Sequence, residues 1–139
     1  MKKMLKLGLL FNIIIVSFNS YANATLDDYS KVAETIQYYF DGTQHGKPDL
    51  VRKAFTETLY IQWIDKDGKF RSRGAKSYIE RIKVDQEVPR FGHIVSMDIT
   101  NKGASAKVEI NWRERRIVDY LLLLKINGQW KITNKIAAF

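Results

Sequence analysis

The last 23 residues of the chain, 117–139, constrain its fold more than any other segment. They predict two long strands joined by a tight turn at Asn127-Gly128, a dipeptide that tolerates the positive φ angles of a type I′ hairpin. Residues 120–124 (YLLLL) are apolar on both faces, which predicts a central strand covered on both sides. After the turn, one alternating set should share a face: Trp130, Ile132, Asn134 and Ile136. The other set should face the opposite way: Lys131, Thr133 and Lys135.

Residues 1–24 have the features of a secretory signal peptide. Three lysines precede an apolar run over residues 7–18, and Ala22-Asn23-Ala24 is a small-x-small cleavage site. The run is shorter than the roughly 20 residues that span a bilayer. We therefore expect cleavage after Ala24, a single domain over residues 25–139, a periplasmic or secreted location, and no stable membrane insertion after cleavage. An uncleaved N-terminal anchor is the alternative.

The composition excludes several kinds of site. The chain has no cysteine, which rules out disulfides, thiolate metal ligands and a cysteine nucleophile. Its two histidines have no carboxylates at ligand spacing, and no glycine-rich phosphate loop is present. We expect no metal and no cofactor. The net charge of +8 falls to +5 without the leader, which indicates either a solvated basic surface or an attraction to anions. An exported domain without a recognisable binding motif is not expected to bind nucleic acid.

The hydrophobic periodicity predicts helices first and then a mostly antiparallel sheet, which is an α+β fold. In Ser105–Arg115, strict alternation places the small and apolar side chains on one face and the charged ones on the other. In Phe91–Thr100, His93 shares a face with Val95, Met97 and Ile99. The expected helices are Leu26–Phe40, Pro48–Phe55 and Ala75–Val84, and the expected strands before the terminal hairpin are Thr58–Asp65, Lys69–Arg73, Phe91–Thr100 and Ser105–Arg115.

Several short motifs along the chain resemble one family. They are Tyr39-Phe40-Asp41-Gly42, Lys53-Ala54-Phe55, Asp67-Gly68, Asp119-Tyr120, Leu122, Leu124-Lys125, Gly128-x-Trp130-Lys131-Ile132 and Asn134-Lys135. With this element order, the chain resembles the nuclear transport factor 2-like superfamily, and within it the small bacterial family called putative lumazine-binding (SnoaL-like, ketosteroid isomerase-like). The resemblance implies a cone: about three N-terminal helices packed on a curved sheet, with a cavity between them. It also implies a homodimer formed through the outer sheet face. It does not assign a catalytic role to any residue of this chain.

Two residues are candidates for an acid or base. Asp119 lies in an otherwise apolar strand, where burial could tune a carboxyl group for catalysis, or where it could be a structural carboxylate. Alternation puts it on the face opposite Tyr120, so both reach the cavity only across a bulge. If Tyr120 lines the cavity, Asp119 belongs to the outer face. His93 is the second candidate base or a core or rim residue, and His45 is expected in an exposed loop.

The aromatic residues favour a ligand more strongly than the titratable ones do. Aromatic walls with a few polar tips suit a flat, modestly polar molecule. The expected cavity lining is Tyr39, Trp63, Trp112 and Tyr120.

Three functions remain open from the sequence. The first is an exported, dimeric domain that binds a small organic molecule without catalysis. The second is a cofactor-independent isomerase or dehydratase that uses His93 or Asp119 as its base. The third is a structural or protein-interaction module that uses the outer sheet face.

Overall fold

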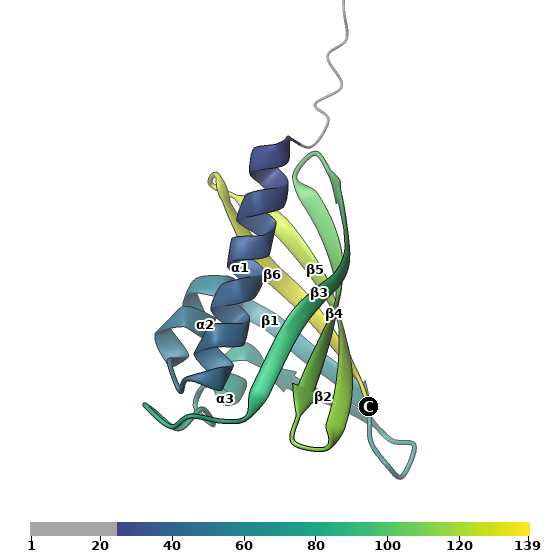
Figure 1. Ribbon diagram of the computed structural model, residues 1–139. Helices are drawn as coiled ribbons and strands as arrows, with labels where there is room; N and C mark the ends of the chain where they lie inside the picture. The colour runs from purple at the N-terminus through teal and green to yellow at the C-terminus, as the bar shows by residue number, and fades with distance from the viewer. Residues whose placement is uncertain (1–24) are drawn as a thin grey trace, which may run out of the picture.

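The computed structural model describes residues 25–139, so the predicted signal peptide lies outside the described residues. Within this range, helices lie on one side of a curved sheet (Figure 1). The helices are α1 (Leu26–Gln44), α2 (Pro48–Ala54) and α3 (Ala75–Ile79). The strands are β1 (Phe55–Ile64), β2 (Phe70–Gly74), β3 (Arg90–Thr100), β4 (Gly103–Trp112), β5 (Arg115–Ile126) and β6 (Gln129–Ala138). The predicted α+β architecture, helices on a mostly antiparallel sheet, is thereby confirmed.

The strands form one sheet in the order β2-β1-β6-β5-β4-β3. Only the β1–β6 pair is parallel, and the other four neighbouring pairs are antiparallel. The turn between β5 and β6 has φ of 49° at Asn127 and 79° at Gly128, as the Asn-Gly pair predicts. The chain therefore returns its last strand to the middle of the sheet, beside the first.

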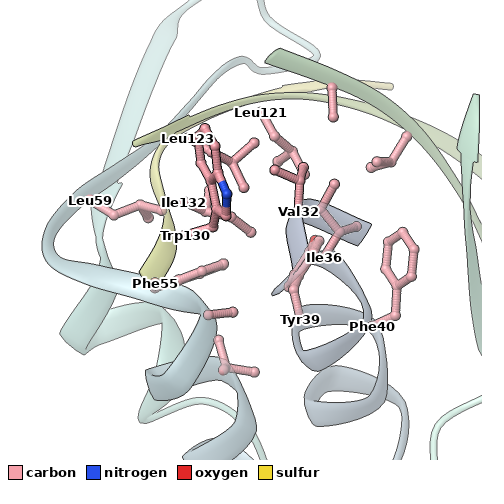
Figure 2. Packing of buried hydrophobic residues seen from close by; sticks show 14 of the residues in the cluster. Val32, Ile36, Tyr39, Phe40, Phe55, Leu59, Leu121, Leu123, Trp130 and Ile132 are labelled. Atoms are coloured by element: carbon pink, nitrogen blue, oxygen red, sulfur yellow. The ribbon is translucent and has the colours of Figure 1, made fainter. Parts of the chain in front are cut away.

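Helix α1 packs its apolar side against the inner face of the sheet. Thr25 caps its start by accepting a hydrogen bond from the backbone N–H of Asp28 at 3.2 Å. The helix continues past Phe40, where the sequence predicted its end, through Gly42 to Gln44. Its inward side chains meet those of β5 and β6 in the main core (Figure 2). The fully buried members include Val32, Ile36, Tyr39, Leu121, Leu123 and Ile132.

A buried polar contact fastens the first turn of α1 to the terminal hairpin. Asp28 Oδ1 accepts hydrogen bonds from Lys125 Nζ at 2.6 Å and from Trp130 Nε1 at 3.0 Å. These bonds lower the pKa of Asp28 to about 2. The carboxylate therefore holds the helix to the sheet in its charged form.

Two β-bulges change which side chains face the core. In β3, Val95 is the extra residue between Ile94 and Ser96, so Met97 and Ile99 face inward while His93 faces outward. In β6, Thr133 is the extra residue, because Leu122 pairs with Asn134 and Leu123 pairs with Ile132. A single extra residue reverses the faces of everything that follows it. Beyond this bulge Lys135 points inward, and Asn134 and Ile136 point outward.

The outer face of the sheet carries many apolar side chains. The strand at residues 120–124, predicted to be covered on both sides, is covered by this chain on one side only, because the helices lie against a single face. Tyr120, Leu122 and Leu124 are about half exposed as a result. Other exposed apolar residues of the outer face are Tyr60, Phe91, Val95, Ile126 and Ile136.

The third helix is shorter than predicted. It ends at Ile79 instead of Val84, and residues 80–89 form a loop that returns to the end of α1. Backbone hydrogen bonds from Val88 to Gln44 (2.8 Å) and from Asp85 to Gly46 (2.9 Å) fix this loop in place. In residues 25–139, no helix is both long and apolar enough to span a membrane.

Candidate functional site

A cavity of about 460 Å³ lies where the inner face of the sheet meets the end of α1, α3 and the loop at residues 80–89. Eight of the nine helices and strands contribute residues to it, all except α2, together with connecting segments. The lining residues are Thr43, Gly46, Ile61, Trp63, Arg73, Tyr78, Arg81, Ile82, Lys83, Gln86, Val88, Arg90, Trp112, Arg113, Ile117, Lys135, Ala137 and Phe139. The cavity is therefore built from segments that are far apart in the sequence.

A connected group of polar side chains forms one end of the cavity. Lys135 Nζ lies 2.7 Å from Asp119 Oδ2 and donates a second hydrogen bond, 2.8 Å long, to the Tyr39 hydroxyl. Tyr39 in turn donates to Asp119 Oδ2 at 2.8 Å. Arg90 donates through Nη2 to the Tyr39 hydroxyl (2.7 Å) and through Nε to Thr43 Oγ1 (3.1 Å). We call these five residues the polar floor.

The local structure explains how the polar floor assembles. On β5 and β6, Asp119 pairs with Ala137 and Leu121 pairs with Lys135, so the carboxylate and the amine are diagonal neighbours on one face. Lys135 reaches that face because of the bulge at Thr133. Tyr39 and Thr43 are four residues apart on α1 and share its inner side. Arg90 begins β3 beside them.

Burial sets the protonation of the polar floor. Burial raises the pKa of the fully buried Tyr39 well above its ordinary value, so its hydroxyl keeps its proton. Burial alone lowers the pKa of Arg90, but the neighbouring Tyr39, Tyr78 and Asp119 outweigh this effect and raise it above its ordinary value. Arg90 is therefore a permanent cation, and Tyr39 is a neutral donor to Asp119.

Two buried polar atoms next to the cavity have no hydrogen-bond partner within residues 25–139. They are Asp119 Oδ1 and Trp112 Nε1. Asp119 contributes no surface to the cavity, but its partner Lys135 does, and Trp112 lines the cavity itself. Buried polar groups nearly always find a partner, so each of these two atoms is a free acceptor or donor that a bound molecule could satisfy.

The walls of the cavity combine tryptophan rings with arginines. The Arg73 guanidinium lies 5.3 Å from the centre of the Trp63 ring, and that of Arg113 lies 5.8 Å from the Trp112 ring. Both distances fall in the range of cation–π contacts. Of the lining residues, six are basic and none is Asp or Glu: Arg73, Arg81, Lys83, Arg90, Arg113 and Lys135. The walls therefore present flat apolar faces next to positive charge.

The four residues predicted to line the cavity lie in three different places in the structure. Trp63 and Trp112 line the cavity. Tyr39 lies beneath it, fully buried, and contacts two of the lining residues through its hydroxyl. Tyr120 lies on the outer face, about half exposed, because side chains alternate along β5 and no bulge interrupts that strand before it. The two tryptophans and Tyr39 are thus brought together, and Tyr120 is not with them.

The two candidate bases lie on opposite faces of the sheet. Asp119 is fully buried on the inner face. His93 is exposed on the outer face, opposite Glu109 on β4. His45 follows α1, where its Nδ1 lies 2.7 Å from Glu87 Oε1 near the protein surface. Within residues 25–139, no three His, Cys, Asp or Glu side chains gather where they could hold a metal ion.

Sequence reasoning missed three residues of the polar floor: Thr43, Arg90 and Lys135. The expected alternation places Lys135 on the face opposite Trp130 and Ile132, and Arg90 lies just before the expected strand Phe91–Thr100. One signal was available: an aspartate inside an apolar strand needs a buried cation nearby. Lys135, on the strand paired with it, is the nearest basic residue in the hairpin that could serve.

Comparisons with known proteins agree on the fold. A family model described as putative lumazine-binding matches residues 27–137. A search of curated proteins finds no match. Among solved structures, an NTF2-like protein of unknown function from Shewanella baltica superposes with a TM-score of 0.75 and 25% identity, covering 84% of this chain and 97% of that one.

Two further structures give the same result. An NTF2-like protein of unknown function from Methylobacillus flagellatus has a TM-score of 0.72 and 26% identity, covering 82% of this chain and 93% of its own. One from Silicibacter pomeroyi has a TM-score of 0.74 and 19% identity, with coverages of 84% and 98%. The cone-shaped arrangement of helices on a curved sheet is therefore shared by proteins from several bacteria.

Proposed function

The chain belongs to the putative lumazine-binding family, and from this premise we propose that it binds a small organic molecule in the cavity above the polar floor. The observation that carries the proposal is the cavity itself. Its volume of about 460 Å³ falls within the range of roughly 300–1,000 Å³ that is usual for small-molecule sites. Its lining combines apolar and aromatic side chains with six basic ones, and apolar walls with placed polar groups are usual for such a site.

The shape and chemistry of the walls favour a flat ligand. Trp63 and Trp112 offer broad ring faces, and stacking on such faces is favourable for planar molecules. The family description names lumazine, a flat bicyclic ring, and a tryptophan-walled cavity suits a ligand of that shape.

We propose binding without catalysis as the primary function. A catalytic base must approach the proton that it removes, to within about 3 Å. Asp119 is fully buried behind Lys135 and contributes no surface to the cavity. His93 is on the other face of the sheet.

One observation favours the enzyme as a second candidate. Asp119 Oδ1 has no hydrogen-bond partner within the described residues, and it belongs to a carboxylate in contact with a cavity-lining lysine. A ligand that displaces Lys135 by a small movement would meet an acceptor. Asp119→Asn tests this idea: loss of turnover with unchanged stability would support catalysis, and loss of stability would support a structural carboxylate.

We further propose that the protein is exported and acts as a homodimer. Export rests on the leader-like residues 1–24. The dimer rests on the exposed apolar stripe of β5 and β6, where Tyr120, Leu122 and Ile136 are about half exposed. A second copy is the occupant we propose, since a two-fold axis would set this apolar stripe against itself.

A screen with a matched pair of variants tests the binding proposal. Aromatic and heteroaromatic compounds would be screened by thermal shift, and hits would be titrated by isothermal calorimetry. Ala137→Phe should fill the cavity, whereas Ala138→Phe changes the neighbouring residue, which points outward. If the proposal is correct, some compounds bind the unsubstituted protein and Ala138→Phe but do not bind Ala137→Phe. Circular dichroism should show that both variants are folded. Compounds that still bind Ala137→Phe, or a screen that finds no binding compound, would argue against binding in this cavity.

A further inference from the structure

We infer that the ligand of this cavity is a planar organic anion, with its negative group at Arg90 and Lys135 and its ring between Trp63 and Trp112. The inference rests on the proposed binding function and adds the chemical class of the ligand. Three independent observations support it: the net charge of the polar floor, the free N–H groups of Arg90, and the positions of the Trp63 and Trp112 rings.

The charges of the polar floor do not cancel. Arg90 and Lys135 are cations, Asp119 is the single carboxylate, and the buried Tyr39 keeps its proton. The group therefore carries one excess positive charge in a place that is largely shielded from water. Positive charge that is removed from water is costly without a counter-charge nearby. A bound anion would supply it.

The remaining basic residues of the lining add to this excess. The acidic residues of the loop at residues 80–89 do not offset it, because none of them lines the cavity. Glu80 lies near Lys76, Asp85 pairs with Lys47, and Glu87 pairs with His45. Arg81 and Lys83 have no ion-pair partner within residues 25–139. A cavity whose charged side chains are all basic raises the local concentration of anionic ligands.

Arg90 has donors to spare for an anionic group. Its Nε and Nη2 are used by Thr43 and Tyr39, while Nη1 has no hydrogen-bond partner among the described residues. These two bonds also fix the plane of the guanidinium, which lines the cavity. A fixed guanidinium with a free N–H edge is well suited to a carboxylate or another planar oxyanion. Lys135 lies on the same floor and can share the negative charge.

The rings argue for an organic anion over an inorganic one. Trp63, Trp112 and Tyr78 supply aromatic surface that a phosphate or sulfate ion would leave unused. Arg73 and Arg113 lie beside the two tryptophans, so a ring that stacks there also meets positive charge at its edge. A flat ring with an acidic group uses both features of the cavity.

Three probes of nearly equal shape test the charge: 2-naphthoate, 2-naphthamide and 2-naphthylmethylammonium. Isothermal calorimetry on the full folded domain should give the anion an affinity at least about tenfold above that of the amide, because charge-assisted hydrogen bonds are about twice as strong as neutral ones. The ammonium probe should not bind. Adding salt should weaken naphthoate binding and leave naphthamide binding nearly unchanged.

Two arginines of the same strand provide a matched pair of variants. Arg73→Gln removes a cavity-lining charge, and Arg71→Gln removes an equal charge from a residue outside the lining, which pairs with Asp65. We expect Arg73→Gln to weaken naphthoate several-fold and Arg71→Gln to have little effect. Arg90→Gln should weaken it most. Arg90→Gln also removes hydrogen bonds within the polar floor and so could change stability. Arg73 and Arg71 are outside the polar floor, so comparing these two variants tests the effect of charge separately from folding.

The outcomes separate the two proposals. If 2-naphthamide binds as tightly as 2-naphthoate and Ala137→Phe abolishes both, the cavity binds ligands but the inference of an anion is wrong. If naphthoate binding survives Ala137→Phe, the anion binds elsewhere and the inference is also wrong. If inorganic phosphate competes at equal affinity, the requirement for a planar ring is overturned. If none of the three probes binds, the inference fails together with this form of the binding proposal.

Discussion

Lys135 Nζ lies 2.7 Å from Asp119 Oδ2 on the inner face of the sheet, with both side chains almost completely removed from water. The pair joins the neighbouring strands β5 and β6. It also holds Tyr39 and, through it, Arg90. The positions of four polar side chains therefore depend on one ion pair, and the position of that pair depends on a single bulge residue.

Breaking the ion pair from one side should destabilise the protein strongly. Asp119→Leu leaves the ammonium group of Lys135 buried without its carboxylate, and such losses typically cost about 3–5 kcal/mol. Chemical denaturation would measure the change in the free energy of unfolding. The control is the double variant Asp119→Leu with Lys135→Met, which should recover most of the loss because no buried charge is left unpaired. Equal destabilisation in the single and double variants would contradict this account.

Acid should release the start of α1 from the terminal hairpin. The pKa of Asp28 is lowered from 3.8 to about 2 in the folded state, chiefly by its hydrogen bond from Lys125. A carboxyl group with a depressed pKa contributes stability that is complete above its unfolded value and is lost as the pH falls toward its folded value. Unfolding free energies should therefore drop between about pH 4 and pH 2.

Asp28→Asn should flatten that pH dependence. The matched control is Asp27→Asn, which changes the adjacent, exposed carboxylate that pairs with Lys31. The account is wrong if Asp28→Asn leaves the slope below pH 4 as steep as in the unsubstituted protein.

A methyl group at Gly92 should disturb the contact between β3 and α1. A Cβ atom there would lie 2.4 Å from ring atoms of Phe40, closer than atoms can pack. Gly92→Ala should therefore cost about 1–3 kcal/mol, as overpacked cores do. Gly103→Ala is the control, because its Cβ would meet no atom closer than 3.7 Å. Thermal unfolding of both variants measures the difference, and equal melting temperatures would refute the proposed close contact.

A charge on the outer sheet face should separate the proposed dimer. Leu122 is 55% exposed in the single chain, so Leu122→Glu should leave the fold intact while placing a like-charged pair across a two-fold interface. Size-exclusion chromatography with light scattering should show a dimer for the unsubstituted protein and a monomer for Leu122→Glu. Ser77→Glu is the control, because Ser77 is exposed on α3, on the opposite side of the sheet from the proposed interface. A monomer without any substitution would contradict the dimer.

Much of the fold could be predicted from local patterns. Asn127-Gly128 predicted the turn, because the pair adopts the required positive φ angles cheaply. The alternation in β4 was also correct: Ala106, Val108 and Ile110 are buried on one face. Such regularities reflect side-chain burial on a strand or helix, which sequence periodicity records directly.

The polar floor could not be predicted in the same way, because it depends on irregularities. The bulges at Val95 and Thr133 reverse the facing of His93 and Lys135 relative to the rest of their strands. A bulge with an ordinary residue leaves no clear mark on the sequence, and strict alternation then gives the wrong face. Trp63 and Trp112 were assigned to the cavity from residue type, and they do line it.

Native mass spectrometry of the protein, purified gently from its own source, tests the central claim most directly. The account predicts a reproducible extra mass on the folded protein that fits a small planar acid and that Ala137→Phe removes while Ala138→Phe retains it. A protein that carries no extra mass, and that also fails to take up any compound of the aromatic screen, would contradict a ligand-binding cavity. The outer sheet face would then be the better place to look for its function.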